Sequence, residues 1–399
     1  MRLLRTSLLV ATVAALVAAC STTPQISEHE AAAKKLNPGQ SSLILDPTTF
    51  DKLPEMNDAD WEPALAAFKE SCKKMIKKEG WEGVCMAANQ VAYGQAKNFF
   101  MANFVPYQTV SVKRNNDLTI HVTDTGLMTG YYEPILYGSR KKKAPYIHPL
   151  HTMPNDLITV DLTELYPQLK GLRLRGQIEG NKLVPYDTRA EMHRKNKKLD
   201  QYAIAWVEDP VAAFFLQIQG SGRVVLPDGS YMRVGYGDVN GHPYQGIGRY
   251  LVRKGYLKSH ELSMQSIRAW AKKNPKKVQD VLNQNPSYVF FVERTDQKPE
   301  EGPLGAQGVP LTEQGSVAVD RRFYEMGWPL VVDVYQPNPE LKFTKAVVAQ
   351  DTGGAIRGPI RYDFFWGSGD DAGDAAGRQS SQVKSWVLLP HGVKPPKNK

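Results

Sequence analysis

Two aspartates near the C-terminus, Asp351 and Asp363, flank a segment of small and flexible residues. This segment, residues 352–359, contains three glycines, and an aromatic run follows at residues 364–366. Carboxylates can exchange protons, glycines let the backbone approach a ligand closely, and aromatic rings can stack on flat substrates. A third aspartate, Asp320, also follows an apolar run. A single aspartate after a strand is commonly a turn residue, but three in similar settings indicate a site for acid–base chemistry.

The elements that position these aspartates are expected to be β-strands. Each aspartate follows β-branched, apolar or aromatic residues, so we expect each to lie at the end of a strand. From Gly302 onward the chain is rich in strand patterns and ends in one at residues 383–389. Short β-rich runs separated by Gly, Pro and Asp also cover residues 145–249, which is typical of a β-domain. A Gly- and Gln-containing segment, Gln-Ile-Gln-Gly-Ser-Gly-Arg at residues 217–223, lies within that part.

Helical patterns occur in two other places. Apolar residues at helical spacing predict a helix over residues 61–78, and a second helix is predicted from about residue 81 to 100. Farther along, residues 263–273 predict another helix. The next helix is expected to begin at Asn274-Pro275, because proline fits the first helical position.

These patterns predict a mainly β protein with some α-helix, built from two domains. The first domain is expected to be discontinuous, combining residues 51–134, which include the N-terminal helices, with residues 300–399. A smaller β-rich domain, residues 135–299, would be inserted between these two parts. The polar stretch within residues 20–50 predicts a flexible tether. Clefts between domains are favoured ligand sites, so we expect the ligand to bind there.

The N-terminus predicts export and lipid attachment. Arg2 and Arg5 precede a short apolar core at residues 8–16, and small residues precede Cys20. This is the pattern of a lipoprotein signal peptide, residues 1–19, although a plain signal peptide with an incidental cysteine would look similar. The rest of the chain has no run of about 18 apolar residues, so a triacylated Cys20 is the expected anchor. Ser21, where an aspartate would favour retention in the inner membrane, favours the bacterial outer membrane.

The charge of the chain is consistent with an acidic polymer as partner. The formal net charge is +9 over 399 residues, and removal of the signal peptide with its two arginines lowers it to +7. A basic protein facing the periplasm suits peptidoglycan, whose peptides carry carboxylates. Nucleic acid would suit the same charge, but a lipoprotein rarely meets it, so we expect no nucleic-acid partner.

Two cysteines, Cys72 and Cys85, remain once Cys20 is lipidated. An even pair in an oxidising compartment favours a disulfide between the two predicted helices, which would stabilise the fold by roughly 3 kcal/mol. Two separate buried thiols are the alternative.

Several motifs along the chain occur together in one known family. They are Thr-Gly-Tyr-Tyr-Glu-Pro at 129–134, Gln-Ile-Gln-Gly-Ser-Gly-Arg at 217–223, the segment 302–312, Val-Asp at 319–320, Asp-Thr-Gly-Gly-Ala-Ile-Arg-Gly at 351–358, and Tyr-Asp at 362–363. With these motifs the chain resembles the membrane-bound lytic murein transglycosylase A family from about residue 55 onward. Its C-terminal segment resembles the three-aspartate domain of that family.

The resemblance implies a double-psi β-barrel, a smaller inserted β-domain and a glycan groove between them. It also implies cleavage of the β-1,4 bond between N-acetylmuramic acid and N-acetylglucosamine, with a 1,6-anhydro product and no cofactor. By resemblance, Asp363 is the catalytic aspartate, Asp351 lies beside it, and Asp320 is the third of the set.

One carboxyl could perform this reaction if it holds a proton near neutral pH. Its pKa would then lie well above the ordinary value of about 3.9. Burial in an apolar wall and a neighbouring carboxylate both raise a carboxyl pKa. We expect the aromatic run, Phe364, Phe365 and Trp366, to supply the wall, and Asp351 to supply the charge beside Asp363.

Polar, aromatic and small residues of the motifs are predicted to contact the glycan. They are Thr129, Gly130, Tyr131, Tyr132, Gln219, Ser221, Gly222, Gly354, Ala355 and Trp366. Their side chains and exposed backbone could bond hydroxyl and acetamido groups or stack on sugar faces. Core packing and hydrogen bonds within the sheet are the alternative roles for the same residues.

Other chemistries fit the sequence less well. Asp351-Thr352-Gly353 matches an aspartic-protease triplet, but that mechanism needs two such triplets and the chain has one. The acidic residues at 370–374 lack calcium-loop spacing and the histidines lack a His-Glu-x-x-His pattern, so no metal is predicted. A non-catalytic peptidoglycan-binding lipoprotein and an inverting glycan hydrolase remain open as functions. The expected partners are glycan strands, the outer membrane and, as a further option, cell-wall synthesis complexes.

Overall fold

The computed structural model describes residues 24–169, 172–195, 199–295, 297–298 and 301–396. The predicted signal peptide and the predicted lipidation site, Cys20, lie outside the described residues. Within the described ranges, no helix is long and apolar enough to cross a membrane.

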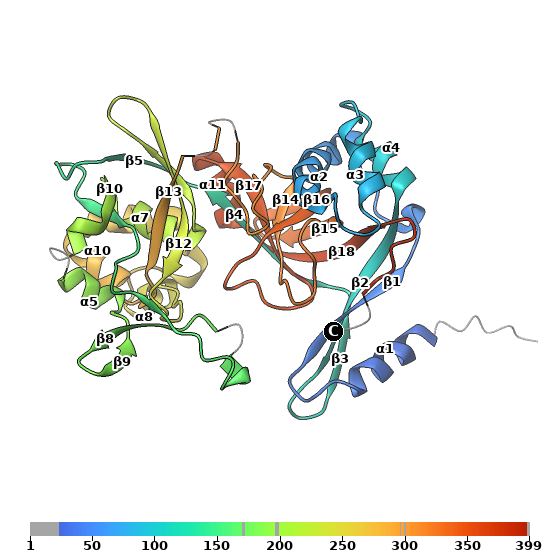
Figure 1. Cartoon of the computed structure of the whole chain (residues 1–399), viewed down its shortest axis with the longest axis horizontal. Helices are drawn as coiled ribbons and strands as arrows, with labels where there is room; N and C mark the ends of the chain where they lie inside the picture. The colour runs from blue at the N-terminus through green and yellow to red at the C-terminus, as the bar shows by residue number, and fades with distance from the viewer. Residues whose placement is uncertain (1–23, 170–171, 196–198, 296, 299–300, 397–399) are drawn as a thin grey trace, which may run out of the picture.

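Two β-rich parts lie side by side, as Figure 1 shows. The larger part contains both the N-terminal and the C-terminal segments of the described chain, and the smaller part is formed by the middle of the chain. The chain crosses between them after strand β4 and returns after strand β13 (Val289–Arg294). This arrangement is consistent with an inserted domain, whose limits remain those predicted from the sequence.

A closed barrel of six strands forms the centre of the larger part. The strands follow one another around the barrel as β4 (Gly126–Glu133), β17 (Arg361–Ser368), β14 (Ser316–Ala318), β16 (Glu340–Asp351), β15 (Pro329–Pro337) and β18 (Ser380–Pro390). Pairing of β18 with β4 closes the ring. Long runs of β-branched and apolar residues form these strands, and their inward side chains make the main hydrophobic core. The predicted class, a mainly β protein built on a β-barrel, is confirmed.

Three further strands extend the barrel sheet at β18. These are β1 (Ser41–Pro47), β2 (Phe104–Arg114) and β3 (Ile120–Thr123). β1 pairs with β2 in antiparallel register along its whole length, and α1 (Pro24–Lys34) precedes it. The tether expected for residues 20–50 is therefore wrong for β1. Its apolar residues, such as Leu43, pack against the sheet instead of remaining in solvent.

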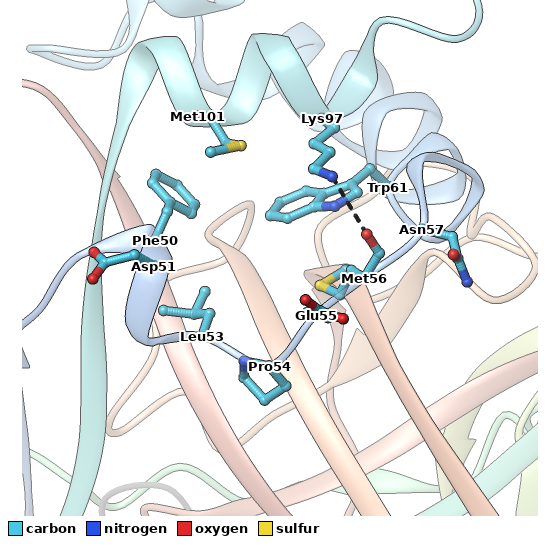
Figure 2. A pocket seen from close by; sticks show the side chains of 10 residues that line it. All are labelled: Phe50, Asp51, Leu53, Pro54, Glu55, Met56, Asn57, Trp61, Lys97 and Met101. Carbon is cyan, nitrogen blue, oxygen red and sulfur yellow. Dashed lines mark hydrogen bonds between the residues drawn. The ribbon is translucent and has the colours of Figure 1, made fainter.

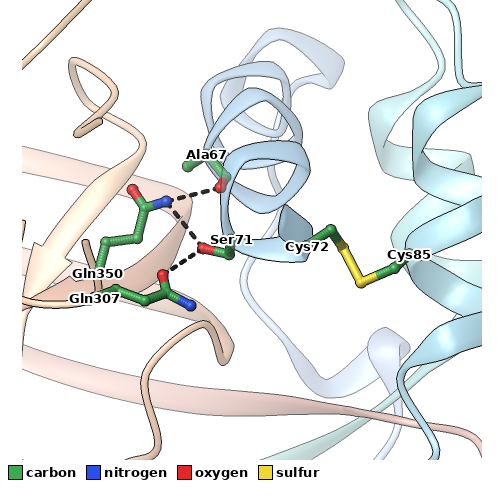
Figure 3. Close-up of a disulfide and its surroundings, with 6 residues drawn as sticks. All are labelled: Ala67, Ser71, Cys72, Cys85, Gln307 and Gln350. Atoms are coloured by element: carbon green, nitrogen blue, oxygen red, sulfur yellow. Dashed lines mark hydrogen bonds between the residues drawn. A yellow bond between two sulfur atoms is a disulfide. The ribbon is translucent and has the colours of Figure 1, made fainter. Parts of the chain in front are cut away.

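Helices α2 (Glu62–Met75), α3 (Glu82–Asn89) and α4 (Ala96–Asn103) cover one side of the barrel. The single helix predicted over residues 81–100 is in fact two, because Gly94 adopts a left-handed conformation between them. The Glu62 carboxylate accepts hydrogen bonds from the N–H groups of Gly94 and Ala96 at 2.9 and 3.1 Å, which caps α4. A disulfide joins Cys72 of α2 to Cys85 of α3, as Figure 3 shows.

The smaller part contains a six-stranded sheet and a three-stranded sheet. The order in the first is β13-β12-β11-β5-β10-β6, with β5 (Ile135–Ser139), β6 (His148–His151), β10 (Ala203–Val207), β11 (Gly222–Val225) and β12 (Tyr231–Val239). The second consists of β7 (Ile158–Thr159), β8 (Arg175–Glu179) and β9 (Lys182–Pro185). The accompanying helices are α5 (Arg189–Arg194), α7 (Pro210–Gln219), α8 (Gly248–Arg253), α9 (Met264–Lys273) and α10 (Pro275–Leu282).

Helix α7 corrects the β-rich interpretation of residues 145–249. Asp209 caps it by accepting a hydrogen bond from Val211 N at 2.8 Å, Pro210 occupies its first turn, and Gly220 ends it in a left-handed conformation. The helices predicted at 263–273 and from Asn274-Pro275 are confirmed as α9 and α10.

Candidate active site

Asp363 lies inside strand β17 rather than at a strand end, so that expectation is wrong for this residue. Strand β17 pairs in parallel with β4, which places Asp363 opposite Thr129 and Phe365 opposite Tyr131. Side chains alternate along a strand, so Phe364 points into the main barrel core while Asp363 and Phe365 point to the other face. The parallel pairing thus brings two distant sequence motifs together at one carboxyl.

The Asp363 carboxylate has a neutral hydrogen-bonding partner. Thr129 Oγ1 donates to Asp363 Oδ1 at 2.6 Å, and Arg361 Nη2 donates to Thr129 Oγ1 at 3.0 Å. Among the described residues, no lysine or arginine nitrogen lies within ion-pair distance of Asp363. The positive charge of Arg361 therefore reaches the carboxyl only at longer range.

Burial raises the pKa of Asp363 to about 6. The hydrogen bond from Thr129 and the charge of Arg361 oppose this rise, and the charge of Asp351 adds to it. Phe365 and Tyr131 pack together at 5.2 Å between ring centroids, in the apolar cluster on the Asp363 face. A carboxyl with this pKa can exchange protons near neutral pH in both directions.

Asp351 is the last residue of β16, in agreement with the prediction of a strand end. Strand β14 lies between β16 and β17, and its residue Ala318 is paired with Asp351 on one side and with Asp363 on the other. Burial raises the pKa of Asp351, although the N–H groups of Thr352 and Ala306 stabilise its charged form. The Tyr131 hydroxyl approaches Asp351 without the geometry of an ordinary hydrogen bond.

Helix α2 stabilises the end of strand β16, next to Asp351, through hydrogen bonds to Gln350, as Figure 3 shows. Gln350 Nε2 donates to Ala67 O at 2.8 Å and to Ser71 Oγ at 2.9 Å. Ser71 Oγ in turn donates to Gln307 Oε1 at 2.8 Å. The Asp351 carboxylate itself accepts a hydrogen bond from Ala306 N at 2.9 Å. The disulfide next to Ser71 therefore belongs to the scaffold that fixes Asp351.

Asp320 has a different environment from the other two aspartates. Its side chain is 1% exposed and forms an ion pair with Arg322 at 2.6 Å, and it also accepts a hydrogen bond from Gly358 N at 2.8 Å. Burial tends to raise the pKa of Asp320, but the hydrogen bonds from Arg322 and Gly358 outweigh it and hold the pKa below its usual value. Asp320 is thus charged at neutral pH, and its hydrogen bond from Gly358 stabilises the turn between Asp351 and Asp363.

Two of the predicted glycan-binding residues have packing roles in the structure. Trp366 contacts Phe364 and Phe343 and donates from Nε1 to Gln379 Oε1 at 2.8 Å, on the face away from Asp363. A Cβ at Gly130 would come within 2.7 Å of Trp366, so glycine is required there by close packing. The aromatic wall expected from residues 364–366 therefore reduces to Phe365, because alternation turns the other two rings inward.

The motif at residues 217–223, which lies in the smaller part, packs against strand β4. Gln219 Oε1 accepts a hydrogen bond from Tyr132 N at 3.2 Å, and the Tyr132 ring is buried against α11 (Asp370–Arg378). A Cβ at Gly222 would meet Leu216 at 2.4 Å, which indicates tight packing. Ser221 is partly buried beside them. These contacts stabilise the position of β4, and none of them is made to Asp363.

Two residues of the turn after Asp351, Gly354 and Ala355, are exposed. No atom of the described residues other than Gly354 and its two chain neighbours lies within 4 Å of a Cβ built at Gly354. Their exposure leaves both residues open to contact with a ligand, and the glycan contact predicted for them from the sequence stays a prediction.

Sequence reasoning missed two contributors to the site, Arg361 and Ala306. Arg361 could have been found by alternation, because it lies two residues before Asp363 and therefore on the same face of β17. Ala306 contributes only a backbone N–H, which no pattern of side chains reveals.

A buried ionic cluster links the two parts close to this site. Glu133, at the end of β4, is 1% exposed and is paired with Arg223 at 2.8 Å and Arg233 at 3.5 Å. Ser368 Oγ of β17 donates to the same carboxylate at 2.6 Å. Breaking one partner of a buried pair is costly, so this cluster fixes the smaller sheet against the ends of β4 and β17.

A separate cavity of about 580 Å³ lies on the helical side of the barrel, next to α4 (Figure 2). Trp61, Lys97 and Met101 line it. Its two carboxylates, Asp51 and Glu55, are exposed, so neither is desolvated in the way that Asp363 is. We therefore place the candidate chemistry at Asp363 and not in this cavity.

Family models match two segments of the chain. The MltA specific insert domain matches residues 127–292, and the 3D domain matches residues 315–389. Membrane-bound lytic murein transglycosylase A of Escherichia coli K12 is 32% identical over 269 residues, covering 65% of this chain and 64% of the relative. The match therefore spans a little under two thirds of that curated relative's length.

Solved structures extend the similarity over most of the chain. The crystal structure of MltA from Neisseria gonorrhoeae is 34% identical, with a TM-score of 0.74, and the alignment covers 90% of this chain and 95% of that one. The lytic transglycosylase LtgG of Burkholderia pseudomallei is 38% identical, with a TM-score of 0.62, over 90% and 98% of the two chains.

Proposed function

Because this chain belongs to the MltA family, we propose that it is a lytic transglycosylase of peptidoglycan. It would cleave the β-1,4 bond between N-acetylmuramic acid and N-acetylglucosamine and leave 1,6-anhydromuramic acid ends. The single observation that carries this proposal is Asp363, a carboxyl whose pKa is raised by burial to about 6 and which has no ion-pair partner among the described residues.

In the first step Asp363 acts as the general acid. Its proton passes to the glycosidic oxygen as the bond from that oxygen to C1 of the muramic acid breaks. The leaving sugar departs with a free 4-hydroxyl, and positive charge develops at C1. A carboxyl with an ordinary pKa would already be ionised at neutral pH and would have no proton to give.

In the second step the same group acts as the base. The Asp363 carboxylate accepts the proton of the C6 hydroxyl while O6 bonds to C1, which closes the anhydro ring. The carboxyl is protonated again at the end, and no water is consumed. One group can serve in both steps because its pKa lies near the working pH.

The neighbours of Asp363 would tune this exchange. Thr129 orients the carboxyl through a 2.6 Å hydrogen bond and stabilises its charged form during the second step. Asp351 adds negative charge that favours the protonated form and can also stabilise positive charge at C1. Asp320 would act indirectly, by holding Gly358 and hence the turn that connects the two other aspartates.

We propose that some of the site residues contact the glycan and that the others support the strands that carry the site. Tyr131, Gly354 and Ala355 are on or near the Asp363 face and would contact the glycan. Gly130, Tyr132, Gln219, Ser221, Gly222 and Trp366 would support the strands, given the packing described above. We propose no cofactor for this reaction.

The cellular setting is also a proposal. The curated relatives are named membrane-bound, and the sequence around Cys20 supports a lipid anchor in the bacterial outer membrane, facing the periplasm. The substrate there would be peptidoglycan glycan strands, and association with cell-wall synthesis complexes would bring the enzyme to its substrate.

Mass spectrometry of muropeptides released from purified sacculi tests the function. We expect products ending in 1,6-anhydromuramic acid with the wild-type chain, and none with Asp363→Asn. Reducing ends would indicate a hydrolase, and binding without release would indicate a peptidoglycan-binding lipoprotein. Either of these two results would overturn the proposal.

A further inference from the structure

A small pocket of about 130 Å³ lies in the smaller part, between β6, α5, α7 and α10. Ile147 and His193 on its rim are exposed, so the pocket opens to solvent. Helix α7 separates it from the barrel, because Gln217 lines the pocket while Gln219 bonds to strand β4. The pocket is thus distinct from the site at Asp363.

A buried arginine, Arg189, forms part of the pocket, and no aspartate or glutamate within the described ranges is paired with it. Its Nε donates to Asn285 O at 3.1 Å, and its Nη2 donates to Gln217 Oε1 at 2.7 Å and to Ser287 O at 2.6 Å. Every one of these acceptors is neutral. Nη1 makes no hydrogen bond to any residue within the described ranges.

The Arg189 guanidinium is therefore fixed in position by neutral acceptors, and none of these acceptors neutralises its positive charge. The guanidinium lies 4.9 Å from the Phe214 ring and 5.0 Å from the Tyr288 ring, which restricts its movement. Burial lowers its pKa to about 10, so it still carries a full charge at neutral pH. No aspartate or glutamate lines the pocket in the described part of the chain. A buried cation without a counter-ion is unfavourable, and a bound anion would relieve that cost.

A second unsatisfied group, His151, lines the same pocket. This residue is buried, with 4% of its surface exposed, and its Nε2 has no hydrogen-bond partner in the part of the chain that the structure describes. The Tyr288 hydroxyl lies 2.8 Å from Nδ1 and can donate to it, which leaves the ring proton on Nε2. Burial lowers the pKa of His151 to about 4, so the ring is neutral and offers one N–H donor.

Arg189 and His151 line the same pocket, and each has one nitrogen, Nη1 and Nε2, without a hydrogen-bond partner among the described residues. A planar carboxylate has two oxygens that can accept from a guanidinium and a neighbouring N–H together. Ala213, Leu282 and Met192 supply apolar surface beside these donors, and the volume admits only a short chain. We propose that this pocket binds a small carboxylate carried on a short aliphatic group. The inference does not depend on the proposed catalytic function.

Nuclear magnetic resonance of the full chain, labelled at histidine Cε1, tests the proposal. Propionate is titrated in at constant ionic strength, with propionamide as the uncharged control and inorganic phosphate as a different anion. We expect saturable shifts of the pocket histidines with propionate, at a dissociation constant on the order of 1–10 mM, and no saturable shift with propionamide. His29 and His121, which lie elsewhere, should not respond.

The source of the carboxylate is distinguished by a second probe, N-acetyl-D-alanine. Tighter binding of this compound than of propionate would identify a peptide C-terminus as the ligand, and the reverse order would identify a free short-chain acid. Both results support the site. Binding of phosphate without propionate, equal binding of propionamide, or no saturable shift would each overturn it.

Variants separate this pocket from non-specific anion binding. Arg189→Gln should weaken propionate binding by at least about tenfold, since the charged hydrogen bond is lost. If that variant does not fold, His151→Phe retains the guanidinium and the ring while removing the second donor. We expect it to weaken binding about fivefold, read from His148 and His193. Arg175→Gln is the matched control, because Arg175 is paired with Asp238 outside the pocket and should change nothing. Unchanged binding in both pocket variants would contradict the proposal.

Discussion

Asp320 and Asp363 are carboxylates on adjoining segments of one barrel, but their surroundings differ in the charge of the nearest partner. Asp320 is paired with a guanidinium and two N–H groups, and its pKa is held below the usual range. Asp363 is bonded to a neutral hydroxyl, and burial raises its pKa to about 6. The comparison teaches that burial alone does not make a catalytic acid. The partner decides whether a buried carboxyl is a fixed charge or an exchangeable proton.

The largest difference is expected in activity. Asp363→Asn should lower the release of anhydro-muropeptides by at least about 10³-fold, because both proton transfers use this one group. Asp320→Asn should keep a substantial part of the wild-type rate, since its role is to hold the turn. Rates of release from sacculi, with circular dichroism as the control for folding, check this pair. Equal losses in the two variants would remove the distinction between the aspartates.

Asp363→Asn should lower activity but raise the free energy of unfolding at neutral pH. The folded chain holds this proton up to about pH 6, whereas the unfolded chain releases it near pH 3.8. Stability from this group therefore falls as pH rises between these values, and the cost is fully present above pH 6. Asp363→Asn should be more stable than wild type by about 3 kcal/mol at pH 7.5 and by little at pH 4. Urea unfolding at the two pH values measures it, and a destabilised variant at pH 7.5 would contradict the account.

Asp320 should show the reverse dependence. Its folded pKa is depressed, so the stability that it contributes is present above about pH 3.8 and is lost as pH falls below that value. Asp320→Asn should cost about 1–2 kcal/mol at pH 7, because hydrogen bonds to Gly358 and Arg322 are weakened. The same urea series reports this cost. An unchanged free energy of unfolding at pH 7 would show that the ion pair contributes nothing.

The smallest effects are opposite shifts of the pH profile by two neighbours of Asp363. Thr129→Val removes a hydrogen bond that lowers the pKa of Asp363, so the alkaline fall in kcat/KM should move to higher pH. Asp351→Asn removes a charge that raises this pKa, so the fall should move to lower pH. Measurement of kcat/KM between pH 4.5 and 8.5 checks both. Shifts in the same direction would show that another group controls the profile.

The strands that carry the aspartates could be predicted largely from the sequence, because long runs of β-branched residues have few alternatives to strands. Their closure into a barrel was expected only from the resemblance to a known family. Strand β1 was missed because the polar residues that precede it, up to Gln40, suggested a tether over the whole segment. Helix α7 was missed although Asp209, Pro210 and Gly220 mark its ends, because its apolar residues also fit a buried strand.

At the site, residue types were predictable but their directions were not. The face of β17 that carries Asp363 depends on strand register, and that register also turns Phe364 and Trp366 inward. The pairing of Asp320 with Arg322 depends on the local path of the turn. Neither is expressed in residue spacing, so the difference between Asp320 and Asp363 became visible only in three dimensions.

The proton held by Asp363 is the central claim, and the titration of aspartate carboxyl carbons measures it directly. Carbon-13 labelled wild type and Asp363→Asn would be followed from pH 3 to 8. The account predicts one resonance with a pKa near 6 that is absent from the variant. A wild-type spectrum in which Asp363 titrates near pH 4 would contradict it.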